Sequence, residues 1–222
     1  MRPLQITFIL LAFLAPPLLW LMSRKVQSPR LARGICWGIA ATLITAYAGA
    51  LILKARGHTL DVDDSLPMQL CDWAALATVL ALTRRSPLAF ELAYFWGLAG
   101  TAQALFTPAI EINDGLRVVC FLTIHSTIPA GVLWLMFEYK LRPRPGALLR
   151  VMIWSELYLA TALAVNALTG ANYGFLTHRP ATHTLLDHFS DSRPLYLLEM
   201  NLTALLFFAL LAMPWWRRKS AQ

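Results

Sequence analysis

The sequence predicts an all-α membrane protein, a polytopic bundle of about seven transmembrane helices. First, 58% of its 222 residues are hydrophobic and 14% are charged, with a mean hydropathy of +0.55, whereas soluble domains are usually about 45–50% apolar. Second, the charged residues lie between apolar runs long enough to approach a hydrocarbon core of about 30 Å. We find no separate soluble module, so residues 1–222 are expected to form a single transmembrane domain.

Seven apolar runs give the expected helices in order. The first contains Pro16 and Pro17, and its basic cluster follows the run instead of preceding it, so we interpret it as a retained helix and not a signal peptide. The second is rich in glycine and alanine, which allow close helix packing. The third and fourth form a hairpin around a short basic turn at 83–87. The expected spans lie near residues 4–22, 31–53, 67–83, 87–107, 116–139, 147–168 and 195–216.

The loops alternate in charge, which predicts an orientation. Lys and Arg concentrate in every second loop, so the positive-inside rule places the N-terminus outside and the C-terminus in the cytoplasm. Anionic lipid headgroups explain the net charge of +7, and no nucleic-acid partner is expected. We therefore expect a multi-pass protein of the cell membrane, in bacteria the cytoplasmic membrane. The basic residues on the cytoplasmic side are Arg24, Lys25, Arg30, Arg33, Arg84, Arg85, Lys140, Arg142, Arg144, Arg150, Arg217, Arg218 and Lys219.

Polar residues inside the spans gather in the outer half of this arrangement. Such groups are costly in lipid and normally face a bundle interior or a wet cavity. Glu91 and Glu156 lie deeper, toward the cytoplasmic half. The pattern predicts one cavity open to the outer leaflet or the extracytoplasmic space. Its expected polar residues are Gln69, Cys71 and Asp72 on the third span, Gln103 on the fourth, Cys120 and His125 on the fifth, Asn166 on the sixth, and Glu199 and Asn201 on the seventh.

Cys71 and His125 each have more than one interpretation. Cys71 fits an inert buried thiol, a nucleophile, or a disulfide partner of Cys120, which lies at a similar depth. His125 fits either a packed, hydrogen-bonded group or a catalyst. At about 1.5 Å per residue, Cys71 should lie about 6 Å deep and His125 about 13 Å deep. Neighbouring helices pack about 8–10 Å apart, so the two side chains can meet between them.

Several functional classes lack their motifs. The chain has no GxSxG elbow and no HExxH motif, no pair of buried histidines for haem, and no lysine in the last span for a retinal Schiff base. The loop histidines His178, His183 and His188 do not form a strong metal signature, so neither a metal nor a cofactor is expected. What remains is a thiol beside an imidazole that can accept its proton, with Gln103 or Asp72 to orient the ring.

The most distinctive segments are LPMQLCDW, ELAYFWGLAGTAQALFTP, LRPRPG and NYGFLTHRPATHTLLDHF, together with the intramembrane His125. Over roughly residues 60–215 they resemble the YwaF-like bacterial integral membrane proteins. That group is similar to the transmembrane protein 164 family, whose human member is a cysteine-centred acyltransferase for lysophospholipids, and a similar fold occurs in membrane hydrolases of fatty acid esters. The resemblance implies Cys71 as acyl acceptor and His125 as base. One departure is Gln69, where bacterial relatives often have histidine.

The expected function is therefore a membrane-embedded lipid acyltransferase or lipid ester hydrolase, whose partner is a membrane phospholipid or lysolipid. The alternative is a non-enzymatic seven-helix transporter or sensor that binds a small or lipidic ligand in the same cavity. The expected catalytic residues are Cys71 and His125. The expected substrate-binding or orienting residues are Gln69, Asp72, Gln103, Asn166, Asn172, Tyr173 and Glu199.

The loop at residues 170–194 is longer than the others. Loops beyond about 12–15 residues are usually functional or disordered, and this one contains Leu185, Leu186 and Phe189. We expect it to fold back as a partial lid over the cavity, with a short helix near residues 181–189 that begins at the capping residues 182–184.

Overall fold

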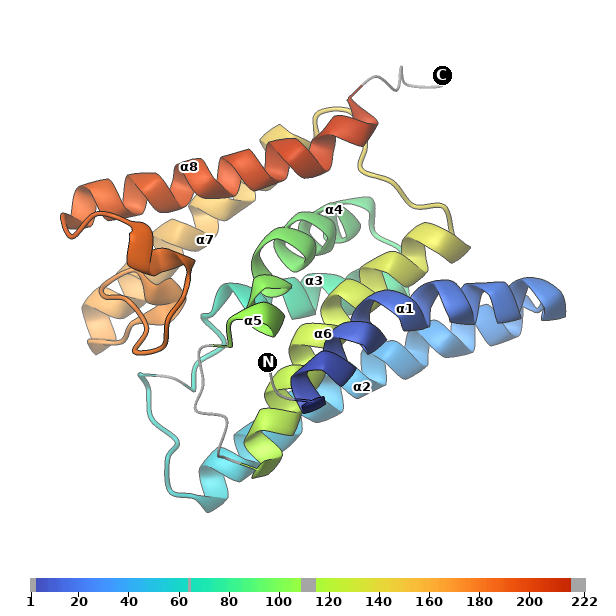
Figure 1. Cartoon of the computed structure of the whole chain (residues 1–222), viewed down its shortest axis with the longest axis horizontal. Helices are drawn as coiled ribbons and strands as arrows, with labels where there is room; N and C mark the ends of the chain where they lie inside the picture. The colour runs from blue at the N-terminus through green and yellow to red at the C-terminus, as the bar shows by residue number, and fades with distance from the viewer. Residues whose placement is uncertain (1–2, 64, 109–114, 217–222) are drawn as a thin grey trace.

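The computed structural model describes residues 3–63, 65–108 and 115–216, and within them all regular structure is helical (Figure 1). A π-helical stretch, Trp96–Thr101, connects α4 to α5, so these elements form one interrupted helix. The described residues thus form seven helical segments, as predicted. The α-helices are α1 (Pro3–Val26), α2 (Pro29–Arg56), α3 (Leu70–Arg84), α4 (Pro87–Phe95), α5 (Gln103–Phe106), α6 (Gly115–Glu138), α7 (Ala147–Thr169) and α8 (Arg193–Ala212).

Five of the described helices are long and apolar enough to cross a membrane, namely α1, α2, α6, α7 and α8. The third segment, α3, has only 15 residues, and the fourth is divided by the π-helical stretch. Figure 1 shows α3 and α4 between the α1–α2–α6 group and the α7–α8 pair. The chain is thus a polytopic membrane protein in which the central hairpin lies inside the bundle.

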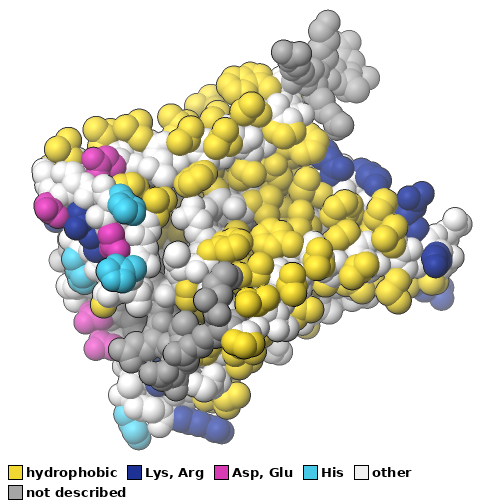
Figure 2. Space-filling model, viewed as in Figure 1, with side chains coloured by type: hydrophobic (Ala, Val, Ile, Leu, Met, Phe, Trp, Pro, Cys, Tyr) yellow, Lys and Arg dark blue, Asp and Glu magenta, His cyan; other side chains and the backbone are white. Residues whose placement is uncertain are grey.

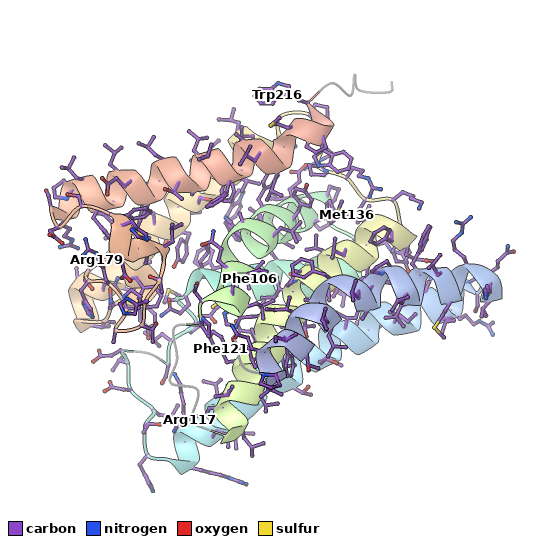
Figure 3. The ribbon with its side chains drawn as sticks, in the orientation of Figure 1. Phe106, Arg117, Phe121, Met136, Arg179 and Trp216 are labelled. Atoms are coloured by element: carbon purple, nitrogen blue, oxygen red, sulfur yellow. The ribbon has the colours of Figure 1, made fainter. Side chains whose placement is uncertain are left out.

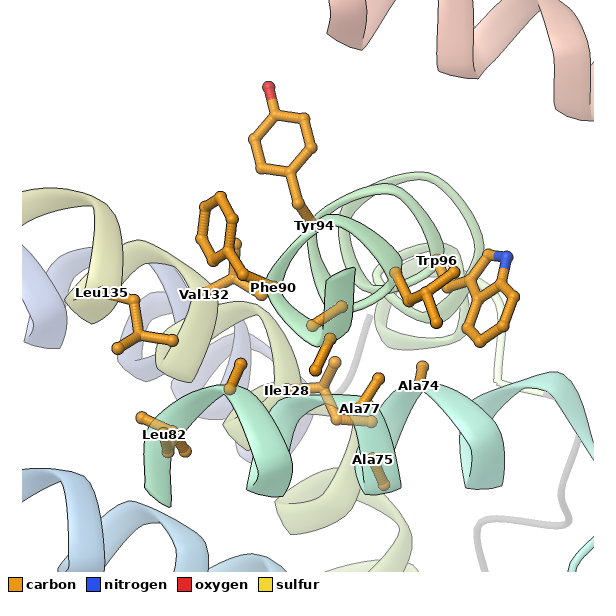
Figure 4. Close-up of a cluster of buried hydrophobic side chains, with 14 of the residues drawn as sticks. Ala74, Ala75, Ala77, Leu82, Phe90, Tyr94, Trp96, Ile128, Val132 and Leu135 are labelled. Atoms are coloured by element: carbon orange, nitrogen blue, oxygen red, sulfur yellow. The ribbon is translucent and has the colours of Figure 1, made fainter. Parts of the chain in front are cut away.

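Small residues allow the central helices to approach closely. Ala74, Ala75 and Ala77 of α3 are at most 5% exposed and lie in the core cluster (Figure 4). In the π-helical stretch, a Cβ at Gly97 would lie 2.8 Å from Ile128 of α6, which is closer than real side chains pack. The aromatic run 94–96 is also buried in this core, so the fourth segment is enclosed by protein and not by lipid.

The outer helices have apolar outward faces. Met22 is 65% exposed, Trp37 56%, Leu149 68% and Leu206 58%, and apolar side chains cover much of the face shown in Figure 2. Side chains of this kind are stable at such exposure when lipid covers them. The exposed apolar surface therefore fits a membrane-spanning bundle.

Charge separates the two ends of the bundle. On the face in Figure 2, most Lys and Arg side chains lie at one end, and the Asp, Glu and His side chains lie at the other. We call the first the basic end; it contains the turns that connect α1 to α2, α3 to α4, and α6 to α7. The opposite end is the cavity end. The expected placement of the basic end in the cytoplasm stays a prediction.

Glu91 of α4 joins several elements near the basic end. Its side chain is 0% exposed, and both oxygens are hydrogen-bonded by arginines. Arg144 donates to Glu91 from Nε at 2.9 Å and from its backbone N–H at 3.0 Å, and Arg150 donates from Nη2 at 2.8 Å and from Nε at 2.9 Å. These bonds fix α4 to the α6–α7 connection and to α7.

Candidate functional site

A cavity of about 290 Å³ lies at the cavity end. Its wall combines the start of α3, the π-helical stretch with α5, the middle of α6, the 170–192 loop and α8. The apolar part includes Phe207 and Phe208 of α8. The polar residues in the wall are Gln69, Cys71, Thr101, Gln103, Thr107, His125, Thr184 and Thr203. The cavity thus brings together four of the residues expected from the sequence: Gln69, Cys71, Gln103 and His125.

The start of α3 positions Cys71. The helix begins at Leu70, three residues later than expected, because Gln69 is extended (φ −76°, ψ 151°) and forms the N-cap. The Asp72 carboxylate accepts a hydrogen bond from the Gln69 backbone N–H at 2.8 Å, as in a capping box. Gln69 Oε1 accepts from the Gly174 N–H at 2.9 Å. Gln69 therefore links the helix start to the loop, outside the helix interior where we expected it.

Asp72 is next to the Cys71 thiol but has a different partner from the one predicted. The thiol donates weakly to Asp72 Oδ1, with 3.9 Å between the atoms, and the Tyr47 hydroxyl of α2 donates to the same oxygen at 2.7 Å. The structure shows no hydrogen bond between Asp72 and His125, so Asp72 does not orient the imidazole. Tyr47 was not anticipated, because a tyrosine inside an apolar run has no distinguishing pattern.

His125 is held by its own helix. It is 6% exposed, and its Nδ1 lies 2.8 Å from the carbonyl oxygen of Phe121, the residue labelled on α6 in Figure 3. The Phe121 and His125 rings are stacked, with 4.0 Å between their centroids. A carbonyl oxygen only accepts, so this contact places the proton on Nδ1 of the neutral ring and leaves Nε2 as an acceptor. The backbone therefore orients the ring, in place of Gln103 or Asp72.

The thiol and the imidazole share the cavity wall but are not hydrogen-bonded to each other. Each is instead held by a neighbour on its own helix, Asp72 for Cys71 and Phe121 for His125. Within the described chain, no hydrogen-bond donor or acceptor contacts His125 Nε2. The His125 imidazole, with Nε2 free to accept a proton, and the Cys71 thiol therefore line the same largely apolar cavity.

Thr101 is a wall residue that the sequence analysis missed. It is 4% exposed, and its hydroxyl has no hydrogen-bond partner among the described residues. It ends the π-helical stretch, and such stretches occur frequently at functional sites. Only the small residues of the GLAGT segment hinted at an irregular helix here.

The cysteines are all free thiols in the structure. Cys120 faces α2, where a Cβ at Gly49 would lie 3.3 Å from its sulfur, and Cys36 accepts a hydrogen bond from the Trp134 indole N–H at 3.3 Å. The Cys71–Cys120 disulfide considered above is therefore not formed. Cys71 is the cysteine that lines the cavity.

Four of the expected site residues lie outside the cavity wall and organise the loop. Asn166 bonds both the N–H and the carbonyl of Tyr173, at 2.8 and 2.9 Å. The Tyr173 hydroxyl donates to the Val62 carbonyl and accepts from the Leu66 N–H. Asn172 accepts from the Thr177 N–H at 3.0 Å, and Glu199 accepts from the Ser190 N–H at 2.6 Å. Because these hydrogen bonds hold the loop in place, we assign the four residues a structural role.

The loop closes one side of the cavity. Leu185, Leu186 and Phe189 line it, and a 3₁₀-helix at Leu185–His188 begins after Thr184, whose hydroxyl accepts from the Leu186 N–H at 3.3 Å. The helix lies where we expected one but is shorter than residues 181–189. The Thr184 N–H and the adjacent His183 hold the pKa of Asp187 below its usual range. No three His, Cys, Asp or Glu side chains in the described ranges could hold a metal ion.

Comparison with known proteins extends over nearly the whole chain. An uncharacterized protein of Treponema pallidum (strain Nichols) is 27% identical over 177 residues, which covers 76% of this chain and 72% of the relative. No solved structure matches the chain. The sequence model of the TMEM164 family matches residues 2–212. The chain therefore belongs to the TMEM164 family.

Proposed function

We propose that this protein transfers or hydrolyses the acyl groups of membrane lipids, with Cys71 as nucleophile and His125 as base. The observation that supports this most is the position of both side chains on the wall of one largely apolar cavity. A nucleophile and a base within reach of the same bound ester are the minimum required for covalent acyl transfer.

His125 is suited to receive the thiol proton. Its Nδ1 is bonded to a backbone carbonyl, which leaves Nε2 as the basic atom. The Asp72 carboxylate, 3.9 Å from the sulfur, opposes a standing negative charge on that atom. We therefore assign the deprotonation of Cys71 to the moment of attack, when the ester is bound and His125 accepts the proton.

The acyl group would pass through a thioester. The Cys71 sulfur bonds to the ester carbonyl carbon, and the carbonyl electron pair moves to oxygen. Collapse breaks the bond to the lipid oxygen, which takes the proton from His125 and leaves as a lysolipid. A second alcohol or a water then loses its proton to His125 and attacks the thioester, and the proton returns to sulfur. Transfer and hydrolysis differ only in this acceptor.

Among the wall residues, we assign Thr101 as donor to the oxygen that becomes negative. Its hydroxyl is buried in the wall and has no partner among the described residues. Fixed donors of this kind stabilise the transition state because they need no reorganisation during the reaction. The apolar side chains of α8 in the wall, among them Met200 and Phe207, suit the acyl chain.

A binding function is the second candidate. It is favoured by the absence of a hydrogen bond between Cys71 and His125, since a transporter or sensor needs a cavity but no reactive pair. The two candidates differ in chemistry, because only acyl transfer forms a thioester on Cys71.

The deciding experiment traps that thioester. Purified protein in detergent is incubated with phospholipid carrying a labelled acyl chain, quenched in acid, and measured by intact mass. We expect one added acyl group that hydroxylamine removes, lost in Cys71→Ala and retained in Cys120→Ala, a matched control because Cys120 lies outside the cavity wall. Specific lipid binding without any acyl adduct or turnover would reject the proposal and favour the binding function.

A further inference from the structure

A second hollow, of about 440 Å³, lies at the basic end of the bundle. We call it the basic pocket. It shares no residue with the cavity that contains Cys71. Its wall comes from the end of α1, the start of α2, the turn between them, the C-cap of α3 and the end of α6. It consists of Ser23, Arg24, Gln27, Ser28, Pro29, Ala32, Arg33, Arg85, Glu138 and Tyr139.

Three arginines from three helices converge on this pocket. Arg24 lies near the end of α1, Arg33 near the start of α2, and Arg85 is the C-cap of α3. No carboxylate of the described residues lies within ion-pair distance of any of them. Glu138, the acidic residue in the wall, accepts a hydrogen bond from the Ser23 hydroxyl at 2.7 Å. The wall therefore keeps an excess of positive charge.

One helix start adds to this excess, that of α2, whereas α1, α3 and α6 end at the pocket and bring the partial negative charge of helix C-termini. The N-terminus of α2 carries a partial positive charge, and its first turn contains no acidic residue. Basic residues near a helix N-terminus are unfavourable, since they add like charge to the helix dipole. An anion bound in the pocket would compensate the arginines and the start of α2 together.

Tyr139 and Arg85 meet in the wall of the basic pocket. The Tyr139 hydroxyl is buried and has no hydrogen-bond partner within the described part of the chain. Arg85 ends α3 in the left-handed conformation common at helix C-caps (φ 52°), and its guanidinium lies 4.1 Å from the Tyr139 ring centroid. The Arg85 guanidinium and the Tyr139 ring thus pack on each other in the wall of the pocket.

We propose that the basic pocket binds a phosphate group, the chemistry shared by an anionic phospholipid headgroup and soluble phosphate. Arginine is suited to this because its planar fork pairs with two phosphate oxygens. The surroundings suit a lipid: Val26, Leu31 and Trp37, near the pocket in sequence, are 60%, 41% and 56% exposed. Their apolar side chains could contact the acyl chains of a lipid whose headgroup occupies the pocket.

The test compares two double variants with the same loss of charge. Arg33→Gln/Arg85→Gln removes pocket arginines, and Arg30→Gln/Arg84→Gln removes neighbouring arginines that do not line the pocket. Native mass spectrometry measures binding of phosphatidylglycerol against phosphatidylcholine. Thermal unfolding in phosphatidylcholine nanodiscs measures stabilisation by sodium phosphate against sodium chloride at equal ionic strength.

We expect the pocket variant to bind the anion at least about tenfold more weakly, and the control variant to bind like the native protein. Binding of phosphatidylglycerol alone would identify a lipid headgroup, and stabilisation by sodium phosphate would identify a site open to soluble phosphate. If the double variant does not fold, Arg33→Gln against Arg30→Gln gives the same comparison. Equal losses in both variants, or no preference for phosphate-bearing anions in the native protein, would overturn the proposal.

Discussion

Glu91 and Asp72 are two carboxylates inside one bundle, and their surroundings differ. Glu91 is fully buried and hydrogen-bonded by two guanidinium groups and one backbone N–H. Asp72 is partly buried and accepts hydrogen bonds from Tyr47, from the Gln69 backbone and, weakly, from Cys71. These three donors are a phenol, a backbone N–H and a thiol, and none of them carries a formal charge.

The difference shows what each end of the molecule is suited for. A carboxylate whose oxygens are bonded by two arginines is fixed and has no free capacity for chemistry, so Glu91 stabilises the join between α4 and α7. Asp72 is held by weaker, neutral donors beside a thiol that lines a cavity. The comparison of Glu91 with Asp72 indicates that a polar residue in a membrane helix marks a functional site only when its partners leave charge or hydrogen-bonding capacity unused.

The largest effect is expected at His125. His125→Ala should slow acyl transfer per folded molecule by roughly 10²–10⁴-fold, the usual contribution of a positioned base. Single-turnover measurement of thioester formation separates the chemical step from lipid binding. The control is His183→Ala, because His183 is an exposed loop histidine that does not line the cavity containing Cys71 and His125. Equal rates in the native protein and His125→Ala would remove this residue from the mechanism.

The opposite result is expected at Glu91. Arg144→Ala/Arg150→Ala leaves a buried carboxylate without a cation and should lower the free energy of unfolding by about 3–5 kcal/mol. Acyl transfer per folded molecule should stay unchanged. Denaturation in mild detergent tests the stability, with Arg30→Ala/Arg84→Ala as the charge-matched control. Similar losses in both double variants would show that the Glu91 ion pairs add no specific stability.

At Thr101 the expected effect is on rate alone. Thr101→Val keeps the shape of the side chain but removes the donor, and should reduce acyl transfer by roughly 10²–10³-fold. Thr101→Ser should retain most of the rate, because serine keeps the hydroxyl. Both variants are measured at saturating lipid, so that a change in binding does not enter. Full activity of Thr101→Val would show that the Thr101 hydroxyl is not the donor to the oxyanion.

A smaller effect on stability is expected when a single tyrosine hydrogen bond is removed at the cavity end. Its size should depend on whether the acceptor is a charged carboxylate or a neutral carbonyl. Tyr47→Phe removes a hydrogen bond to the Asp72 carboxylate and should cost about 1.5–3 kcal/mol of stability, whereas Tyr158→Phe removes one to the Met68 carbonyl and should cost about 0.5–1.5 kcal/mol. Unfolding of the two variants under one condition gives the difference directly. A larger loss in Tyr158→Phe would reverse this order.

The sequence predicted most of the fold because the number and the length of the apolar runs can be read directly from the order of its residues. It placed the start of α3 too early, since the extended Gln69 depends on its contact with Gly174, far away in the chain. It also expected Asn166 and Tyr173 at the site, whereas they bond each other. Thr101 and Tyr47 could not be predicted for the same reason. What distinguishes them is their hydrogen bonding in the folded chain, which the residue type alone does not indicate.

The smallest effect concerns pH and the loop that closes the cavity. Asp187 accepts a hydrogen bond from the Thr184 N–H at 3.1 Å, and its pKa is held below the usual range by that bond and by His183. A carboxylate with a lowered folded pKa contributes stability above its unfolded pKa of about 3.9, and this is lost as pH falls through the lower folded value.

Hydrogen exchange of residues 184–189 should therefore be faster in Asp187→Ala than in the native protein at pH 6. The difference should disappear at the acid end, below the folded pKa. Because both proteins are compared at the same pH, the intrinsic exchange rates cancel. Glu156→Ala, an exposed helix residue far from the loop in sequence, should match the native protein throughout. A difference between Asp187→Ala and the native protein that persists at the lowest pH would show that the aspartate holds the loop through packing and not through its charge.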